Sequence, residues 1–248
     1  MKVGVLGAGA FHDYWKLAFV QYNIDYDVIP AKNVLSLDVS LQNYSHIIDC
    51  LDPNGTISNY EAYCSELDAL RSAIGNQCQT VKYYYLSSAN VYQPSRLPIC
   101  ELSQIKQSSE NPYVRNKIYT ENRLKNVFNY FSIFRLPALW STPTDRRSAS
   151  FFSDLLNARL NSVRLPQRDG DCDIFSFMYY QDAANMVVSG LLTESRTVTN
   201  ITSNLWASRT FLKCYPNHPP NFDSRIGIRL VSIHMPPRKP TKSIFDYI

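Results

Sequence analysis

The chain has 248 residues, of which 45% are hydrophobic and 13% aromatic, enough to bury a substantial core and to exclude a disordered chain. Its net charge of +4 comes from scattered basic residues, which indicates a solvated surface and no nucleic-acid partner. Six widely spaced cysteines without a CxxC pair indicate reduced thiols, a cytoplasmic protein and no metal centre. No apolar run reaches roughly 18 residues, so we expect no membrane span.

Strands and helices alternate over the first 140 residues. Short runs of β-branched and aromatic residues predict strands at 2–6, 26–29, 46–51, 81–88 and 132–139. Helical spacing of apolar residues predicts helices at 12–22, 60–74 and 117–129. The second of these helices should break at Gly75-Asn76. Such alternation implies parallel pairing with right-handed crossovers, so the predicted fold is α/β, a Rossmann-like doubly wound parallel sheet.

The pattern changes beyond residue 140. A helix is predicted at 148–160, a strand at 174–180 and a helix at Asp182–Leu192, and a proline-rich, irregular end follows. We therefore predict a main body at 1–140 and a small C-terminal lobe at 141–248, with the helix at Asp182–Leu192 able to return to the main body.

Polar or glycine-rich segments follow three of the predicted strands. In open α/β sheets, ligands bind beyond the carboxyl ends of the strands, where the loops converge. The segments are GAG after the first strand, LDPN after the third and SSAN after the fourth. The candidate chemistry is therefore expected to gather at one edge.

The first of these segments, Gly7-Ala8-Gly9, could let the backbone approach a pyrophosphate at a helix N-terminus. The fingerprint is incomplete, since His12 takes the place of the last glycine in GxGxxG, and Asp13 would oppose phosphate unless it points away. A tight turn without a ligand is the alternative. The cofactor-binding residues predicted here are Gly7, Gly9, Ala10 and Phe11.

The end of the second predicted strand lacks the acidic residue that would bind a ribose 2′-hydroxyl. Lys32 stands near that place and could meet a 2′-phosphate, which favours NADP slightly over NAD. An ordinary surface lysine is an equal alternative.

Ser88, Tyr113 and Lys117 are the candidate catalytic residues. A phenol is a poor acid or base near neutrality, but an ammonium four residues along the same helix face favours the phenolate. The pair could exchange a proton with a substrate alcohol or carbonyl while Ser88 holds the same oxygen. The spacing alone is weak, because 17 tyrosines and 25 basic residues make chance matches common.

Order along the chain strengthens this interpretation. SSANVY (87–92), Glu101, PYVRNK (112–117), Glu121, FRLPALW (134–140) and YQDAA (180–184) follow one another as in the extended short-chain dehydrogenases/reductases. The chain resembles this family, also called the NAD-dependent epimerase/dehydratase family, from residue 1 to about 205. The resemblance implies a nicotinamide dinucleotide, a small substrate lobe, usually a nucleotide-sugar substrate, and a possible homodimer.

By motif position, the resemblance makes Tyr113 the acid/base, Lys117 the ribose-binding lysine and Ser88 the family's Ser/Thr. It places Asp38 at the adenine pocket, and Leu51 at a strand end completes the predicted cofactor residues. The predicted substrate-binding residues are Ser88, Ala89, Asn90, Pro137 and Ala138.

Several departures from the family pattern bear on the substrate. Ala89-Asn90 replaces the Asp-Glu pair of the sugar dehydratases, so a 4,6-dehydratase is not expected. Ala138 replaces an asparagine that touches substrate, and Phe175 replaces the arginine that binds substrate phosphate. Arg164 or Arg168 could supply that charge instead.

We therefore expect an NAD(P)-dependent oxidoreductase or epimerase acting on a hydroxyl or keto group of a sugar-like, nucleotide-activated small molecule. The alternative is a catalytically degenerate relative that binds a dinucleotide or another ligand as a regulatory module. Other candidates have structural interpretations: His12 and His46 as hydrogen-bonded histidines, Cys50 as a core residue that could line the pocket, and Tyr83-Tyr84-Tyr85 as a buried strand.

Overall fold

The computed structural model describes residues 1–35, 41–52, 59–77, 79–141, 174–192, 197–203, 206–208, 227–228 and 231–232. Asp38, Arg164, Arg168 and the helix predicted at 148–160 lie outside these residues. None of the described helices is long and apolar enough to cross a membrane.

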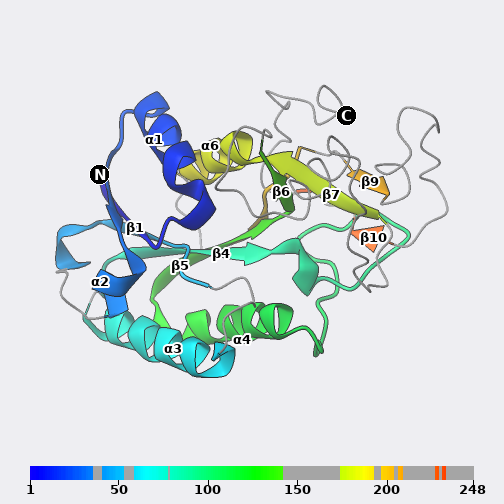
Figure 1. Ribbon diagram of the computed structural model, residues 1–248, viewed down its shortest axis with the longest axis horizontal. Helices are drawn as coiled ribbons and strands as arrows, with labels where there is room; N and C mark the ends of the chain where they lie inside the picture. Colours follow the sequence, from blue (N-terminus) through cyan, green and yellow to red (C-terminus); the bar gives the residue numbers. More distant parts are fainter. Residues whose placement is uncertain are drawn as a thin grey trace.

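A parallel sheet of six strands forms the centre of the molecule, in the order β2-β1-β3-β4-β5-β8 (Figure 1). The strands are β1 (Lys2–Leu6), β2 (Asp25–Ile29), β3 (His46–Asp49), β4 (Lys82–Ser88), β5 (Tyr130–Leu136) and β8 (Val198–Asn200). The predicted fold class is confirmed. Because the strand order reverses between β1 and β3, a crevice for a ligand is expected at the carboxyl ends of these two strands.

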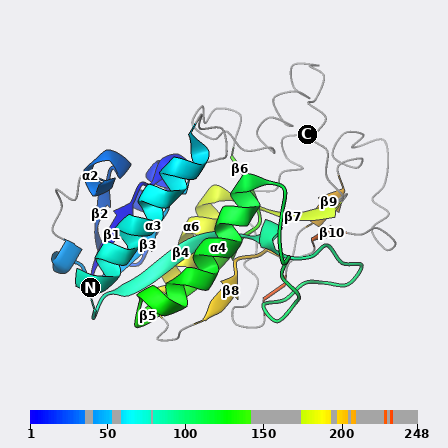
Figure 2. The same ribbon diagram turned by 90° about the horizontal axis from the view of Figure 1, so that it is seen from below.

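Helices cover both faces of this sheet (Figures 1 and 2). One face carries α1 (His12–Gln21) and α6 (Tyr180–Gly190), and the other carries α2 (Ala31–Leu35), α3 (Tyr60–Gln77) and α4 (Pro112–Val127). Beside the main sheet, a smaller one contains β6 (Ala138–Trp140), β7 (Ile174–Tyr179) and β10 (Gly227–Ile228), with β9 (Trp206–Ser208) antiparallel to β7. The described residues also form the short 3₁₀ turns η1 (Gly9–Phe11), η2 (Leu41–Asn43) and η3 (Ala89–Val91).

The tyrosine run of β4 divides between the two hydrophobic layers. Tyr83 and Tyr85 belong to the layer under α3 and α4, whereas Tyr84 and Leu86 belong to the layer under α1 and α6. Alternate side chains of a strand point to opposite faces, which explains this division. All three tyrosines are buried, so the buried-strand interpretation is confirmed.

Helix α3 corrects one prediction. It does not break at Gly75-Asn76 but continues to Gln77. A Cβ at Gly75 would lie 2.5 Å from the backbone oxygen of Val127 in α4. The glycine therefore permits a close approach of two helices and is not a stop signal.

Helix α4 also begins earlier than residue 117. It starts at Pro112, and the Asn111 side chain accepts hydrogen bonds from the backbone N–H groups of Tyr113 and Val114. Asparagine at the N-cap and proline at the first helical position are favourable start signals. This start places Tyr113 in the first turn and Lys117 one turn later, on the same face.

His46 opens β3 as a buried, neutral histidine. Its ring stacks on Tyr84 at 5.8 Å, and its Nδ1 lies 2.9 Å from the Ser45 hydroxyl. Burial, helped by Lys82 and the chain N-terminus, lowers the pKa of His46 to about 4.

We expect this histidine to make the fold acid-sensitive. An unfolded histidine binds its proton near pH 6.5, so the folded state loses stability as the pH falls from about 6.5 to about 4. The free energy of unfolding should therefore fall less between neutral and acidic pH in His46→Gln than in the wild type, by about 1–2 kcal/mol. Urea denaturation at the two pH values measures this difference. The exposed His12→Gln is the control. An unchanged pH dependence in His46→Gln would contradict the assignment.

Candidate active site

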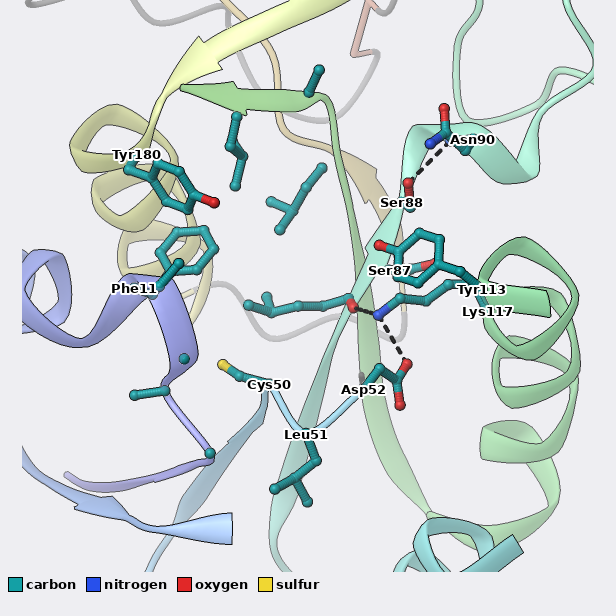
Figure 3. A pocket seen from close by; sticks show the side chains of 18 of the residues that line it. Phe11, Cys50, Leu51, Asp52, Ser87, Ser88, Asn90, Tyr113, Lys117 and Tyr180 are labelled. Carbon is teal, nitrogen blue, oxygen red and sulfur yellow. Dashed lines mark hydrogen bonds and ion pairs between the residues drawn. The ribbon is translucent and has the colours of Figure 1, made fainter. Parts of the chain in front are cut away.

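A cavity of about 550 Å³ lies at the carboxyl ends of the central strands (Figure 3). The turn after β1, the ends of β3 and β4, the start of α4, the β5–β6 connection and the start of α6 all contribute to it. Twelve of the residues predicted from the sequence line this cavity: Gly7, Gly9, Ala10, Phe11, Leu51, Ser88, Ala89, Asn90, Tyr113, Lys117, Pro137 and Ala138.

The glycine turn places two glycines with left-handed backbone at the cavity. Gly7 and Gly9 have φ angles of +75° and +52°, which side chains rarely allow. A Cβ at Gly7 would lie 2.7 Å from Leu51, whereas a Cβ at Gly9 would meet nothing within 4 Å. Gly7 therefore allows close packing, and Gly9 leaves open space above its backbone. Asp13 is exposed and is not among the lining residues, so the turn fits a dinucleotide phosphate.

Lys32 lies elsewhere. Its neighbour Ala31 lines the cavity at the start of α2, but Lys32 is exposed and is not one of the lining residues. Its contact with a 2′-phosphate stays a prediction.

The three candidate catalytic side chains line the same cavity from two elements. Ser88 ends β4, and its Oγ accepts a hydrogen bond from the backbone N–H of Asn90 at 3.2 Å. Tyr113 and Lys117 come from α4, and the Lys117 Nζ lies 5.4 Å from the centre of the Tyr113 ring. Figure 3 shows the phenol, the ammonium and the hydroxyl on one side of the cavity. This arrangement suits proton exchange with an oxygen bound between them.

Asp52 is a member of the site that sequence reasoning missed. Its Oδ2 lies 2.9 Å from the Lys117 Nζ, which also donates to the Leu86 carbonyl at 2.5 Å. Burial works to lower the pKa of Lys117, but Asp52, Tyr113 and Asp49 together outweigh it and the pKa is raised. Burial likewise works to raise the pKa of Asp52, but Lys117 and Arg71 outweigh it and the pKa is lowered. Both groups are therefore charged.

The Lys117–Asp52 ion pair is part of a longer chain of buried charged side chains. Arg71 of α3 donates from Nη2 to Asp52 at 2.5 Å and from Nε to Asp49 at 2.8 Å. The Tyr83 hydroxyl donates to Asp49, and the Tyr85 hydroxyl donates to Asp52. Asp49, Arg71, Asp52 and Lys117 thus form a buried chain of two anions and two cations, here called the Asp52 chain. Its sequence signal was two aspartates three residues apart at the end of an apolar strand.

A second buried hydrogen-bond network, here called the Ser87 network, holds Ser87, the neighbour of Ser88. Ser87 donates to Glu121 Oε1 at 2.5 Å, and Arg135 donates to both oxygens of Glu121 at 3.0 and 2.6 Å. Arg135 also donates to the Tyr92 hydroxyl at 2.7 Å. Ser87 is therefore held by a structural network, and the substrate contact predicted for its neighbour Ser88 stays a prediction.

The wall opposite Tyr113 is largely apolar. Phe11 and Tyr180 lie across the cavity from Tyr113 (Figure 3), and their rings pack edge to face at 4.9 Å. Pro137 and Ala138, at the β5–β6 connection, also line the cavity. Cys50 also lines the cavity, and burial together with Asp49 raises the pKa of its thiol well above the usual value. Within the described residues, no group of three or more metal-ligating side chains occurs.

Comparison with known proteins supports the fold. No family profile and no curated protein matches the sequence. Solved structures do match. UDP-glucuronic acid 4-epimerase from Bacillus cereus, in complex with UDP-glucuronic acid and NAD, is 16% identical with a TM-score of 0.66, over 94% of this chain and 86% of that one. dTDP-4-dehydrorhamnose reductase from Bacillus anthracis, in complex with NADP, is also 16% identical with a TM-score of 0.66, over 94% and 83%.

A third similar structure is dTDP-glucose 4,6-dehydratase from Bacillus anthracis in complex with NAD. It is 10% identical with a TM-score of 0.67, over 94% of this chain and 84% of that one. The epimerase and the reductase are enzymes of the kind that the resemblance to the extended short-chain dehydrogenases/reductases predicted, whereas the expected absence of a 4,6-dehydratase activity stays a prediction. At these identities, the likeness establishes a shared fold.

We expect the Ser87 network to be essential for stability. Arg135→Met should destabilise the protein by about 3–5 kcal/mol, because Glu121 would remain buried without its cation. Urea denaturation measures the loss. The matched control is Arg123→Met, which breaks a more exposed ion pair with Asp68 and should leave the denaturation midpoint nearly unchanged. Equal effects of the two substitutions would refute the expectation.

Proposed function

We propose that the protein is an NAD(P)-dependent oxidoreductase or epimerase that acts on a hydroxyl or keto group of a sugar-like, nucleotide-activated small molecule. The observation that carries the proposal is that Ser88, Tyr113 and Lys117 line one cavity with the Gly7-Ala8-Gly9 turn. The similar solved structures support it, since they hold NAD or NADP and act on nucleotide sugars.

In this proposal, each side chain has a separate task. A bound nicotinamide dinucleotide would supply the hydride donor or acceptor. The Tyr113 phenol gives a proton to the substrate oxygen or takes one from it, and Ser88 holds that oxygen by a hydrogen bond. The Lys117 ammonium donates to ribose hydroxyls, and the backbone at Gly9 faces the phosphates. An epimerase would return the hydride to the opposite face of the same carbon.

We do not propose a dehydration, although one similar structure is a dehydratase. Eliminating water from a sugar needs a further acid and base beside the reacting carbons. The residues after Ser88 that line the cavity are Ala89 and Asn90, and neither side chain can exchange a proton.

A ligand-binding protein without turnover is the second candidate. The observation that favours it is the engagement of Lys117, two of whose three N–H groups already bond to Asp52 and the Leu86 carbonyl. Such a protein would bind a dinucleotide but would not consume it. A turnover assay with a Tyr113 variant separates the two candidates.

We expect Tyr113→Phe to abolish turnover and leave the cofactor in place. Loss of the phenolic proton should reduce the rate by on the order of 10²–10⁴-fold, measured with oxidised NAD or NADP and a panel of hydroxyl substrates that includes UDP-glucuronic acid and UDP-glucose. The control is Tyr119→Phe, on the same helix but exposed and bonded to Asp68. Binding without turnover in the wild type would favour the second candidate, and failure to bind either dinucleotide would exclude both.

Lys32 gives a test of cofactor choice. If its ammonium meets the 2′-phosphate, Lys32→Ala should weaken NADPH binding about tenfold and leave NADH binding unchanged. Fluorescence titration of both dinucleotides measures the difference. Lys16→Ala, another exposed lysine on a helix, is the control. Equal losses for the two dinucleotides would contradict a role in recognising the 2′-phosphate.

A further inference from the structure

Lys117 keeps its charge in surroundings that normally remove it. Its side chain is 6% exposed, and the rings of Tyr85 and Tyr113 lie 4.7 and 5.4 Å from the ammonium. Burial disfavours the charged form of lysine and can lower its pKa by several units. An ammonium in this position therefore needs a counter-ion.

Within the described part of the chain, Asp52 is the carboxylate that forms an ion pair with Lys117, at 2.9 Å. Its side chain is 2% exposed. Arg71 donates to Oδ1 and the Tyr85 hydroxyl to Oδ2, so three donors from α3, β4 and α4 fix the carboxylate. Figure 3 shows Lys117 and Asp52 as a pair at the cavity. The Lys117 Nζ also donates to the Leu86 carbonyl at 2.5 Å.

Other ionisable groups also face Lys117, from every element packed around it. They are Asp49 at the end of β3, Cys50 and Asp52 after it, Tyr85 of β4 and Tyr113 of α4 itself, and Arg71 of α3 bonds to Asp52 beside them. Asp49 is already bonded to Arg71 and to the Tyr83 hydroxyl. The direct neutralisation of Lys117 therefore falls to Asp52.

We propose that Asp52 is a positioning residue: it is the counter-ion that keeps Lys117 as an ammonium and fixes that ammonium on the cavity wall beside Tyr113. The inference rests on the proposed function, in which Lys117 needs the third N–H of an ammonium for the ribose hydroxyls, because two already bond to Asp52 and the Leu86 carbonyl. It adds a residue that acts through Lys117 and that the catalytic motif does not contain.

Burial and Asp52 act on the pKa of Lys117 in opposite directions, so the removal of Asp52 should lower that pKa. Burial lowers the pKa of Lys117, and Asp52 is the group that raises it most. With asparagine at position 52, burial remains and the counter-ion is gone. Lys117 should then lose its proton at a pH at least about two units lower than in the wild type.

The experiment follows Lys117 by NMR in lysine-labelled protein over a pH titration, with the signal assigned from Lys117→Arg. In Asp52→Asn, Lys117 should titrate at least about two pH units lower. The matched control is Asp49→Asn, the same change in the same chain at a carboxylate that bonds to Arg71 instead. Arg71 stays charged at any pH of the titration, so this control should move Lys117 far less. Equal shifts in both variants, or none in Asp52→Asn, would overturn the proposal.

A wild-type measurement keeps the proposal testable if Asp52→Asn does not fold. Lys117 should then titrate above the ordinary lysine value of about 10.4. Titration at or below that value would show that Asp52 does not compensate for burial, and the proposal would fail.

NADPH titration separates this inference from the proposed function. In Asp52→Asn, NADPH affinity should fall as the pH rises through the new titration of Lys117, whereas wild-type affinity stays flat over that interval. If the wild type binds no dinucleotide while Lys117 still responds to Asp52→Asn, the proposed function fails and the counter-ion role stands. If NADPH binds and Lys117 does not respond, the counter-ion role fails alone.

Discussion

The side-chain alternation of β4 is the constraint on which the rest of the site depends. Tyr83, Tyr85 and Ser87 point toward α3 and α4, where each hydroxyl bonds to a buried carboxylate. Tyr84 and Leu86 point to the other layer and pack in its apolar core. A shift of one residue in register would exchange the two sets and bury hydroxyls among apolar side chains. Correct register also sets Ser88 at the cavity, because it ends the same strand.

The buried ion pairs make the packing of the helices on the sheet specific, because each charged side chain requires its partner. Replacing a whole buried ion pair by apolar residues can be neutral, but removing one partner leaves an uncompensated charge in a dry interior. The Asp52 chain and the Glu121–Arg135 pair lie on the same side of β4 and join it to α3, α4 and β5. Each partner therefore requires the others, and the arrangement favours one packing of α3 and α4 against the sheet.

Much of the fold could be predicted because its signals are local. Apolar runs ended by glycine or proline marked the strands, and the parallel sheet then brought Ser88 to the edge where the first helical turn of Tyr113 lies. Gly75 was misread because the same residue serves as a helix stop and as a point of close helix contact, and only the position of Val127 in α4 decides between them.

The role of Asp52 could not be predicted for a related reason. The sequence places this aspartate after a buried strand, where a ligand contact and an ion pair are equally reasonable. Its partners come from α3, β4 and α4, and no spacing along the chain reveals that Arg71 and Lys117 approach it from two helices. Long-range partners of buried charges need the tertiary structure.

The charge balance of the cavity determines how an anionic cofactor would be held. Among the described lining residues, Lys117 is the one cation, and Asp52 neutralises it at 2.9 Å. A dinucleotide phosphate would therefore depend on backbone N–H groups and not on a side-chain cation. The turn at Gly9 can supply them, since its left-handed φ and the open space where a Cβ would stand leave the backbone accessible. In the proposed function, phosphate binding would then rest on backbone geometry, and the third N–H group of Lys117 would serve the ribose.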